Sequence, residues 1–568
     1  MPRTSPTNLQ RINVNDYYWR IFAAAAVTVI IVAAIRWSFD HPYGIQWDEA
    51  IYFNDVQIDL QRLQDGRLST LGGRILIKSY GRPPAFRILA LPFLALFGFH
   101  PTVARSVSLV CFALSSWFIY LATRRITNRA AGAFAVLVFA LSPEVVSASI
   151  FFSTDAPLYL ATAAMLYYMF GYWDDNTELP SNWIGLGLAI GLGLLSKASF
   201  LAIVLPVLAF WIVICHLDLR RAPPWAWRFK VAALAGFVAG PWWLLNITPA
   251  MVIAQLGRGF VRNSLGPPSV ATWLKWLNTV FQGLMGHGVS ILIGLIVITW
   301  LIETILRKSI ALDLFQRLAL GACACAGLPI VLAQLSGTNH LLRHISPALI
   351  PFAIAVGIFA DNVGWPRMRA AIAVSTVLLC GQLLLIVAPV LIPNSRPVGL
   401  RFVNGSLPWE VMIRFDQWNW RPVRDISYNC GVPRPRISYL GGGREFDIPH
   451  IEFPWAAQAT SVHSAVLDFP DVSWLWRYEQ GPIEWQKVMA LSEQSDVVLT
   501  APHYVGEREN KEDLDNEHNA EFASRLSQDP RFGTPIRLEM GRFEPVTVLV
   551  FPKKTLQCPA QPDLPAHP

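Results

Sequence analysis

Two acidic residues, Asp48 and Glu49, stand side by side shortly after the first apolar run of the chain, and Tyr52 follows one helical turn later. Two carboxylates at a membrane edge can deprotonate an acceptor hydroxyl and hold it in place. The pair is therefore a candidate for general-base chemistry. The alternative is the solvated start of a helix, where the helix dipole favours acidic residues.

Two further acids, Asp155 and Glu144, are also candidates for a functional site. Asp155 lies in the segment Phe152-Ser153-Thr154-Asp155-Ala156-Pro157-Leu158, just ahead of another apolar run. It could join the same site, or it could cap the following helix, because Ser, Thr and Asp all suit an N-cap. Glu144 follows Pro143 inside an apolar run, where it could line a cavity or pair with a cation.

Basic residues gather on the same predicted face as these acids, although Lys and Arg are disfavoured at the outer ends of membrane spans. An anionic ligand such as a phosphate would explain them, whereas snorkelling to lipid headgroups is the alternative for any single one. A lone His is more often a hydrogen-bonded structural residue than a metal ligand, and no His, Asp or Glu spacing argues strongly for a metal. The residues are Arg74, Lys78, Arg82, Arg87, Arg105, Lys197, His340, Arg343 and His344.

The composition indicates the class of fold that positions these residues. The chain has 568 residues, 53% hydrophobic and only 15% charged, against roughly 25% charged in a soluble domain. Residues 1–392 carry 28 Lys and Arg against 16 Asp and Glu, while residues 393–568 carry 18 against 23. A single soluble globule is excluded, and the positive excess among apolar runs indicates membrane topology rather than nucleic-acid binding.

Eleven apolar runs are long enough to be considered as membrane-spanning helices. When they cross in turn, the Lys and Arg clusters between them all fall on one side, which the positive-inside rule makes cytoplasmic. The first run is expected to be a retained anchor, because no cleavage pattern follows it. The runs lie near residues 21–37, 102–123, 130–152, 156–173, 183–196, 198–217, 231–248, 283–306, 318–336, 345–362 and 370–392.

Two short segments fix this count. Residues 86–99 are apolar, but they are too few for a full crossing and contain Pro92, so an interfacial helix is predicted there. A break at Ser196-Lys197 returns the chain to the cytoplasmic side. Within the first outer loop, residues 38–85, the helical spacing of Asp48, Tyr52, Asp55, Asp59 and Arg62 predicts an amphipathic helix on the membrane.

The polar tail, residues 393–568, is predicted to be a soluble α/β or α+β domain on the outer side. Short β-rich runs occur at residues 461–469, 496–499 and 547–551, with a polar, helix-compatible stretch at 507–526. Five of the seven Cys residues lie in apolar runs. The other two, Cys430 and Cys558, could form a disulfide if the tail faces an oxidising compartment.

Several short motifs, taken in order, resemble the C superfamily of integral-membrane glycosyltransferases. They are similar in particular to the branch that contains the lipid A aminoarabinose transferase and the dolichyl-phosphate-mannose protein mannosyltransferases. The resemblance covers roughly residues 20–360. The motifs are Asp48-Glu49 with Tyr52, Arg82-Pro83-Pro84, Phe97-Gly98, Arg105, Ser153-Thr154-Asp155-Ala156-Pro157-Leu158, Gly193-Leu194-Leu195-Ser196-Lys197 and Pro241-Trp242-Trp243.

The resemblance implies a polyprenyl-phosphate sugar donor with its lipid tail in the membrane. It implies Asp48 as general base and Glu49 as its helper, with Tyr52 and Asp155 shaping the site. Donor phosphate would be bound by basic residues: Arg82, Arg105 and Lys197, with His340 and Arg343 as weaker candidates. The family often has Lys where this chain has Arg82, and some relatives have Glu at the place of Asp155.

The sequence thus predicts a polytopic α-helical membrane protein of about eleven spans, with interfacial helices in its first outer loop. Residues 1–392 would form the transferase domain and residues 393–568 a periplasmic domain, in a bacterial inner membrane with the N-terminus cytoplasmic. The expected partners are a polyprenyl-phosphate sugar, a lipid, glycan or protein acceptor of the cell envelope, and membrane lipid, without nucleic acid. No cofactor is expected, and a divalent metal is left open. The alternative is a transporter or flippase of a lipid-linked sugar, which the absence of a visible repeat disfavours.

Overall fold

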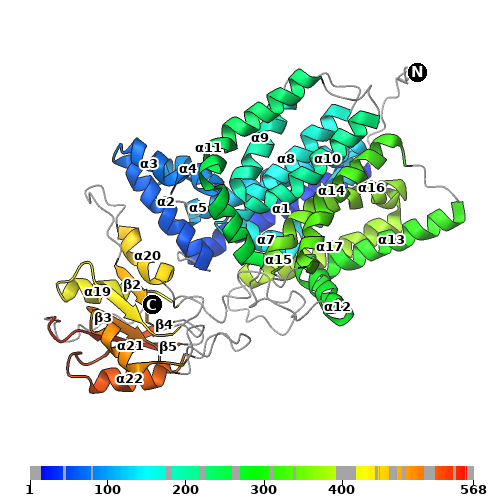
Figure 1. Cartoon of the computed structure of the whole chain (residues 1–568). Coiled ribbons are helices and arrows are strands. Elements are labelled where there is room, and N and C mark those ends of the chain that lie inside the picture. The colour runs from blue at the N-terminus through cyan, green and yellow to red at the C-terminus, as the bar shows by residue number, and fades with distance from the viewer. Residues whose placement is uncertain are drawn as a thin grey trace.

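The computed structural model is a bundle of helices joined to a small α/β tail (Figure 1). The structure describes residues 14–41, 47–77, 81–173, 182–217, 224–258, 269–307, 312–336, 341–391, 418–441, 446, 448–458, 470–475, 482–504, 518–540, 545–556 and 558.

The helical part comprises residues up to Leu391. Its elements are α1 (Val14–Asp40), α2 (Trp47–Gln64), α3 (Leu68–Leu76), α4 (Ala85–Phe97), α5 (Pro101–Ile126), α6 (Arg129–Ala140), α7 (Pro143–Ile150), α8 (Asp155–Trp173), α9 (Asn182–Ser196), η1 (Ala198–Phe200), α10 (Leu201–Leu217), α11 (Trp225–Arg258), α12 (Val270–Thr279), η4 (Val280–Leu284), α13 (His287–Arg307), α14 (Leu314–Ser336), α15 (Leu342–Ile345), η5 (Ser346–Ala348), α16 (Leu349–Asn362), η6 (Trp365–Arg367) and α17 (Arg369–Leu391).

All eleven predicted runs fold as helices, which satisfies the backbone groups internally, as the bilayer core requires. In the described part of the chain, seven helical segments are long and apolar enough to cross a membrane: α1, α5, α11, α13, α14, α15 with α16, and α17. The pair α6 and α7 makes an eighth if it is one span, bent by 70°. Helix α9 has 15 residues, which is shorter than a full crossing. The count of eleven crossings remains a prediction.

The predicted break at Lys197 is confirmed. Helix α9 ends at Ser196, Lys197 has an extended backbone, and η1 begins at Ala198. The short apolar helix predicted at 86–99 is also present as α4, and it ends where Gly98 adopts a φ of 77°.

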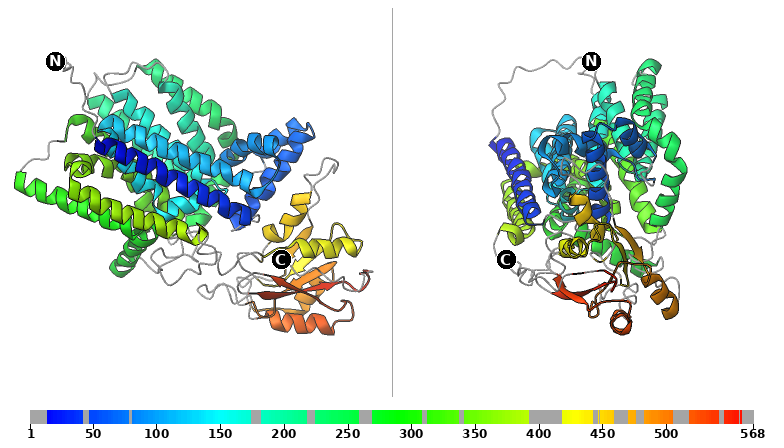
Figure 2. Two further views of the ribbon diagram at one scale, coloured as in Figure 1. Left: turned by 180° about the vertical axis from the view of Figure 1, so that it is seen from behind. Right: turned by 90° about the vertical axis from the view of Figure 1, so that its left-hand side faces the viewer.

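Helix α2 confirms the helix predicted in the first outer loop, but two residues of its predicted polar face, Tyr52 and Asp59, are buried in the protein. Tyr52, Phe53, Val56 and Leu60 are buried, and so is Asp59. Helices α3, α4 and α5 share a hydrophobic cluster with α2, so this loop is a folded layer at one end of the bundle. Figure 2 shows α2, α3 and α4 at the same end as the tail, opposite the start of α1.

The tail contains a five-stranded mixed sheet of order β2-β1-β3-β5-β4. Strands β1, β2 and β3 pair in parallel, whereas β5 pairs antiparallel with β3 and β4. Side chains alternate between two cores: Val497 and Leu499 belong to the core that includes α19 and α20, and Val498 belongs to the core with α21 and α22. The elements are α19 (Arg421–Asn429), β1 (Arg436–Tyr439), α20 (Ile448–Gln458), β2 (Asp471–Trp474), α21 (Trp485–Ser492), β3 (Val497–Thr500), α22 (Asn519–Gln528), β4 (Ile536–Met540) and β5 (Val546–Pro552).

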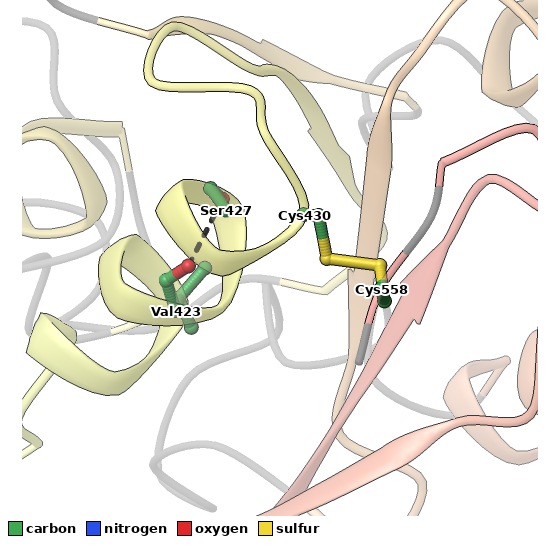
Figure 3. The surroundings of a disulfide bond; sticks show 4 residues. All are labelled: Val423, Ser427, Cys430 and Cys558. Atoms are coloured by element: carbon green, nitrogen blue, oxygen red, sulfur yellow. Dashed lines mark hydrogen bonds between the residues drawn. A yellow bond between two sulfur atoms is a disulfide. The ribbon is translucent and has the colours of Figure 1, made fainter. Parts of the chain in front are cut away.

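The predicted strands near 496–499 and 547–551 are confirmed as β3 and β5, and α22 confirms the later part of the polar stretch at 507–526. The run at 461–469 lies outside the described residues. A disulfide joins Cys430, directly after α19, to Cys558, 128 residues later (Figure 3), so the pairing that the sequence left open is present.

The tail contacts the membrane part through α20. The ring of Phe453 packs with Phe53 of α2 and with Phe99, at centroid distances of 6.0 and 6.5 Å. Asn54 donates a hydrogen bond of 3.2 Å to the carbonyl of Pro449. The tail is therefore docked on the helix whose first turn carries Asp48 and Glu49.

Candidate active site

The two adjacent acids at the start of α2 have different surroundings. Successive residues of an α-helix point about 100° apart, so one helix cannot direct both side chains to the same place. Asp48 reaches a partly exposed cluster of charges, with its side chain 27% exposed. Glu49 points into the protein and is 1% exposed.

Glu49 forms a buried ion pair with Arg105 of α5. Two hydrogen bonds of 2.9 Å join the guanidinium to the two carboxylate oxygens, and the backbone N–H of Phe152 donates a third, also 2.9 Å. Arg105 also donates to the carbonyl of His41, and its guanidinium lies 5.2 Å from the ring centroid of Trp37. The structure thus ties α1, α2 and α5 together here, and it does not bring Glu49 or Arg105 into the exposed cluster.

Asp48 is bound by two arginines from distant parts of the chain. Arg343 Nη2 of α15 lies 2.6 Å from its Oδ2, and Arg82 Nη2 lies 3.5 Å from its Oδ1. Burial disfavours the carboxylate, but the guanidinium groups of Arg343 and Arg82 together hold the pKa of Asp48 below its ordinary value. Asp48 is therefore ionised at neutral pH.

Backbone geometry at Gly81 places Arg82. Gly81 has a φ of 72°, and a Cβ at this position would come within 2.6 Å of the carbonyl carbon of Pro249 in α11. Only Gly allows both this conformation and this approach. The guanidinium of Arg82 then lies 5.6 Å from the ring centroid of Tyr52, a cation–π distance.

Tyr52 lies one turn after Asp48 and also contacts the ring of Phe86, with 4.4 Å between centroids. Burial and the neighbouring Asp48 carboxylate raise the pKa of Tyr52 far above its ordinary value. Its hydroxyl is therefore protonated and able to donate a hydrogen bond.

Asp155 and Lys197 form a second ion pair, with Nζ 2.6 Å from Oδ1. The side chain of Ser153, not that of Asp155, caps the start of α8: the backbone N–H of Asp155 donates a 3.3 Å hydrogen bond to Ser153 Oγ. The carboxylate is left for Lys197, whose place depends on the break after α9. Capping, the alternative considered for Asp155, therefore belongs to Ser153.

The two ion pairs form one cluster. Lys197 interacts electrostatically with Asp48, and Arg343 with Asp155. Side-chain exposures of 31% for Arg82, 30% for Arg343 and 24% for Lys197 leave all three cations reachable. We call Asp48, Arg82, Asp155, Lys197 and Arg343 the charged cluster.

Sequence reasoning missed the buried support of Arg343. Ser346 donates a 2.8 Å hydrogen bond to the Arg343 carbonyl, and the Tyr159 hydroxyl lies 2.5 Å from Ser346 Oγ. Tyr159 stands one helical turn after Asp155, so its helical spacing was the available signal. Sequence reasoning also ranked Arg343 as a weaker candidate than Arg105, whereas the structure brings Arg343 and not Arg105 to Asp48.

A phosphate is not needed to explain two of the other outer cations. Arg87 binds Asp59 through two hydrogen bonds of 2.6 and 2.7 Å, and both side chains are buried. Arg74 pairs with Asp55 at 3.1 Å and with Asp59 at 3.2 Å. Assigning Arg74 and Arg87 to an anionic ligand was therefore wrong, because carboxylates of α2 already balance them.

The remaining candidates divide as follows. Lys78 and His340 lie outside the described residues, and His344 is half-buried beside Arg343. Glu144, left open by the sequence, is buried in the first turn of α7, within electrostatic reach of Asp155 and Lys197. Among the described residues, no group of three or more His, Cys, Asp or Glu is placed to hold a metal ion.

Comparisons with known proteins identify chains of similar sequence and fold. Residues 81–243 match the family model of the dolichyl-phosphate-mannose-protein mannosyltransferases. The crystal structure of ArnT from Cupriavidus metallidurans in the apo state has a TM-score of 0.57 and 14% identity, covering 95% of this chain and 98% of that chain. ArnT bound to undecaprenyl phosphate gives 0.56 and 14%, covering 93% and 97%. A search of curated proteins found no match.

The arabinofuranosyltransferase AftD from Mycobacteria is also similar, with a TM-score of 0.53 and 13% identity over 94% of this chain and 40% of that chain. The chain therefore has the fold seen in ArnT and AftD. The family-model match over residues 81–243 confirms the resemblance found in the sequence to the branch with the dolichyl-phosphate-mannose protein mannosyltransferases.

Proposed function

We propose that this chain transfers a sugar from a polyprenyl-phosphate-linked donor to a hydroxyl of a lipid, glycan or protein acceptor at the outer face of the membrane. The observation that carries the proposal is the charged cluster, in which three reachable cations surround two carboxylates at one end of the helix bundle. The fold shared with ArnT, one structure of which contains undecaprenyl phosphate, supports this donor class.

The charges of the cluster suit this reaction. Arg82, Lys197 and Arg343 supply three positive charges against two from Asp48 and Asp155. A sugar phosphodiester carries one negative charge, so the occupied cluster is neutral. Fixed cations of this kind stabilise a phosphate leaving group without a reorganisation cost at the moment of reaction.

The proposed step keeps that neutrality. The acceptor oxygen forms a bond to the anomeric carbon of the sugar, and the bond from that carbon to the phosphate oxygen breaks with its electron pair going to the phosphate. Asp48 takes the proton of the acceptor hydroxyl. The leaving phosphate gains one negative charge as Asp48 loses one.

In this scheme some predicted site residues contact the substrates and others position those residues. Asp48 is the base, and Arg82, Lys197 and Arg343 bind the phosphate. Asp155 orients Lys197, and Tyr52 supports Arg82. His340 stays a candidate phosphate ligand. Glu49 and Arg105 act at one remove, as positioning residues that fix the start of α2 against α1 and α5.

We further propose that residues 1–392 form the transferase domain and residues 393–568 a periplasmic domain of a bacterial inner-membrane protein, with the N-terminus cytoplasmic. Two observations support this orientation. The tail lies at the same end of the bundle as α2 (Figure 2), whose first turn carries Asp48. Its Cys430–Cys558 disulfide fits an oxidising compartment.

The test uses purified protein in detergent with undecaprenyl phosphates carrying radiolabelled sugars and an outer-face lipid extract. Wild type is expected to move label to a new product, and Asp48→Asn to lose almost all of that transfer. Arg67→Gln is the control, because Arg67 is an exposed cation of the same loop that pairs with Asp65. Donor binding without any transfer by wild type would overturn the proposal in favour of a carrier of lipid-linked sugars.

A further inference from the structure

Glu144 is a buried acid that the proposed step does not use and, unlike Glu49 and Asp59, it is not paired with an arginine in the described part of the chain. It lies in the first turn of α7, directly after the 70° bend that separates α6 from α7. The residue is 8% exposed, and in the described part of the chain no hydrogen bond or ion pair reaches its carboxyl group. The side chains around it on α7, including Val145, Val146 and Ala148, are buried and mostly apolar.

A carboxyl group buried in this way lowers the stability of the folded protein. Burying a polar group without a partner costs about 1–3 kcal/mol by mutational data, and more if it is charged. The two acids of the charged cluster are compensated, since Asp48 binds Arg343 and Asp155 binds Lys197. Glu144 is left with hydrogen-bonding capacity that an apolar residue of similar size would not have.

Glu144 lies next to helices that carry residues of the charged cluster. Helix α7 packs against α15, which carries Arg343, and against α8, which begins at Asp155. The Glu144 carboxyl group lies within electrostatic range of Asp155, Arg343 and Lys197. It also interacts with Tyr159, whose hydroxyl supports Ser346 beneath Arg343. Glu144 therefore borders the place where Lys197 and Arg343 would hold a phosphate.

Three parts of a donor could lie next to Glu144. A phosphate would be repelled by an ionised carboxylate, and a polyprenyl chain has no hydrogen-bond donor. A sugar bonded directly to the bound phosphate carries several hydroxyl donors, and a carboxyl group accepts hydrogen bonds from them whether or not it is protonated.

We propose that Glu144 is a specificity-determining residue that accepts a hydrogen bond from a hydroxyl of the donor's sugar. This inference rests on the proposed function, because it takes the phosphate site from it. It assigns the two ends of the donor head group to different elements: the phosphate to the charged cluster and the sugar to the first turn of α7.

The test separates sugar from phosphate recognition by using two probes. The first is the undecaprenyl-phosphate sugar that gives transfer with wild type, chosen from a panel carrying a hexose, a pentose or an amino sugar. The second is undecaprenyl phosphate without a sugar, measured as a competitive inhibitor. The variants are Glu144→Ala, Glu144→Gln and, as a matched control, Ser149→Ala, which removes a buried and unpaired hydroxyl from the same helix.

Glu144→Ala is expected to lower kcat/KM for the donor by about 10- to 100-fold, the loss associated with one hydrogen bond to a carboxylate. Its inhibition constant for undecaprenyl phosphate should stay within about twofold of wild type. Glu144→Gln should lie between wild type and Glu144→Ala, because its amide keeps one acceptor oxygen. A donor that lacks the contacted hydroxyl should be turned over equally by wild type and Glu144→Ala.

An equal loss of affinity for both probes would overturn the inference, since Glu144 would then act through the cations. So would a Glu144→Ala variant with the kinetics of Ser149→Ala. Failure of the proposed function is a different result, namely a wild-type protein that turns over no member of the panel. The inference is then still decided by competition binding, because a sugar contact must make Glu144→Ala lose affinity for the glycosylated lipid alone.

Discussion

Replacing Arg343 with Gln should move the pH dependence of transfer in a calculable direction. In the proposed step Asp48 must be ionised to accept a proton. Arg343 and Arg82 lower the pKa of Asp48 against the effect of burial, so the activity of wild type should persist as the pH falls through the ordinary carboxylate range. Removing Arg343 raises that pKa, and activity should then be lost at a higher pH.

The structure sets the size of the shift. Arg343 Nη2 lies 2.6 Å from Asp48 Oδ2, which puts the two charges roughly 4 Å apart. At that distance they attract by about 4 kcal/mol at an effective dielectric constant of about 20, and by about 1 kcal/mol in water. With side chains 30% and 27% exposed, an intermediate value of about 2 kcal/mol is appropriate, which corresponds to roughly 1.5 pKa units.

The assay is the initial rate of sugar transfer at low donor concentration, measured from about pH 3 to pH 8, because kcat/KM reports the ionisation of the free enzyme. Arg343→Gln should shift the acid limb upward by about 1–2 pH units and also raise the KM for the donor. Arg67→Gln should match wild type, and tryptophan fluorescence at each pH would verify folding. Coincident acid limbs for Arg343→Gln and wild type would refute the assignment of Asp48 as the ionising base.

Three further predictions concern stability. Glu49→Gln should lower the melting temperature in detergent strongly, because leaving Arg105 buried without its partner costs about 3–5 kcal/mol; an unchanged melting temperature would contradict a supporting role. Phe453→Ala should accelerate limited proteolysis of α20 by about tenfold or more, since deleting a buried aromatic ring costs about 3–5 kcal/mol, and cleavage at the wild-type rate would argue against docking on α2. Cys430→Ser should destabilise the tail by about 4–5 kcal/mol through the long loop it opens. Thermal unfolding of the tail checks this, and equal stability of the variant and the oxidised wild type would disprove it.

The membrane part could be predicted well from local sequence. Each apolar run became a helix because a chain in lipid must satisfy its backbone groups within the segment, and Lys197 marked a real break between two helices. Tail strands β3 and β5 were readable from their β-branched runs, and Cys430 and Cys558 stood apart from the other Cys residues by position alone.

The charged residues were harder, because their type does not reveal their partners. Arg74, Arg87 and Arg105 were grouped with Arg82 as cations that an anionic ligand would explain. All four pair with acids of α2, and three of them pair with acids other than Asp48. Only Arg82 reaches the charged cluster. A basic residue near an outer helix end indicates a local anion, but it does not say whether that anion is a ligand or a carboxylate of the same chain.

The sequence by itself determined that this chain folds as membrane helices with a tail of the α/β or α+β class, because helix and strand formation depend on the spacing of neighbouring residues. Tertiary structure decided which of Asp48 and Glu49 faces the site. Two adjacent side chains on a helix diverge by about 100°, and their partners, Arg343 and Arg105, stand 295 and 56 positions away. Electrostatic interactions depend on distance in space, and no local pattern of residues encodes that distance.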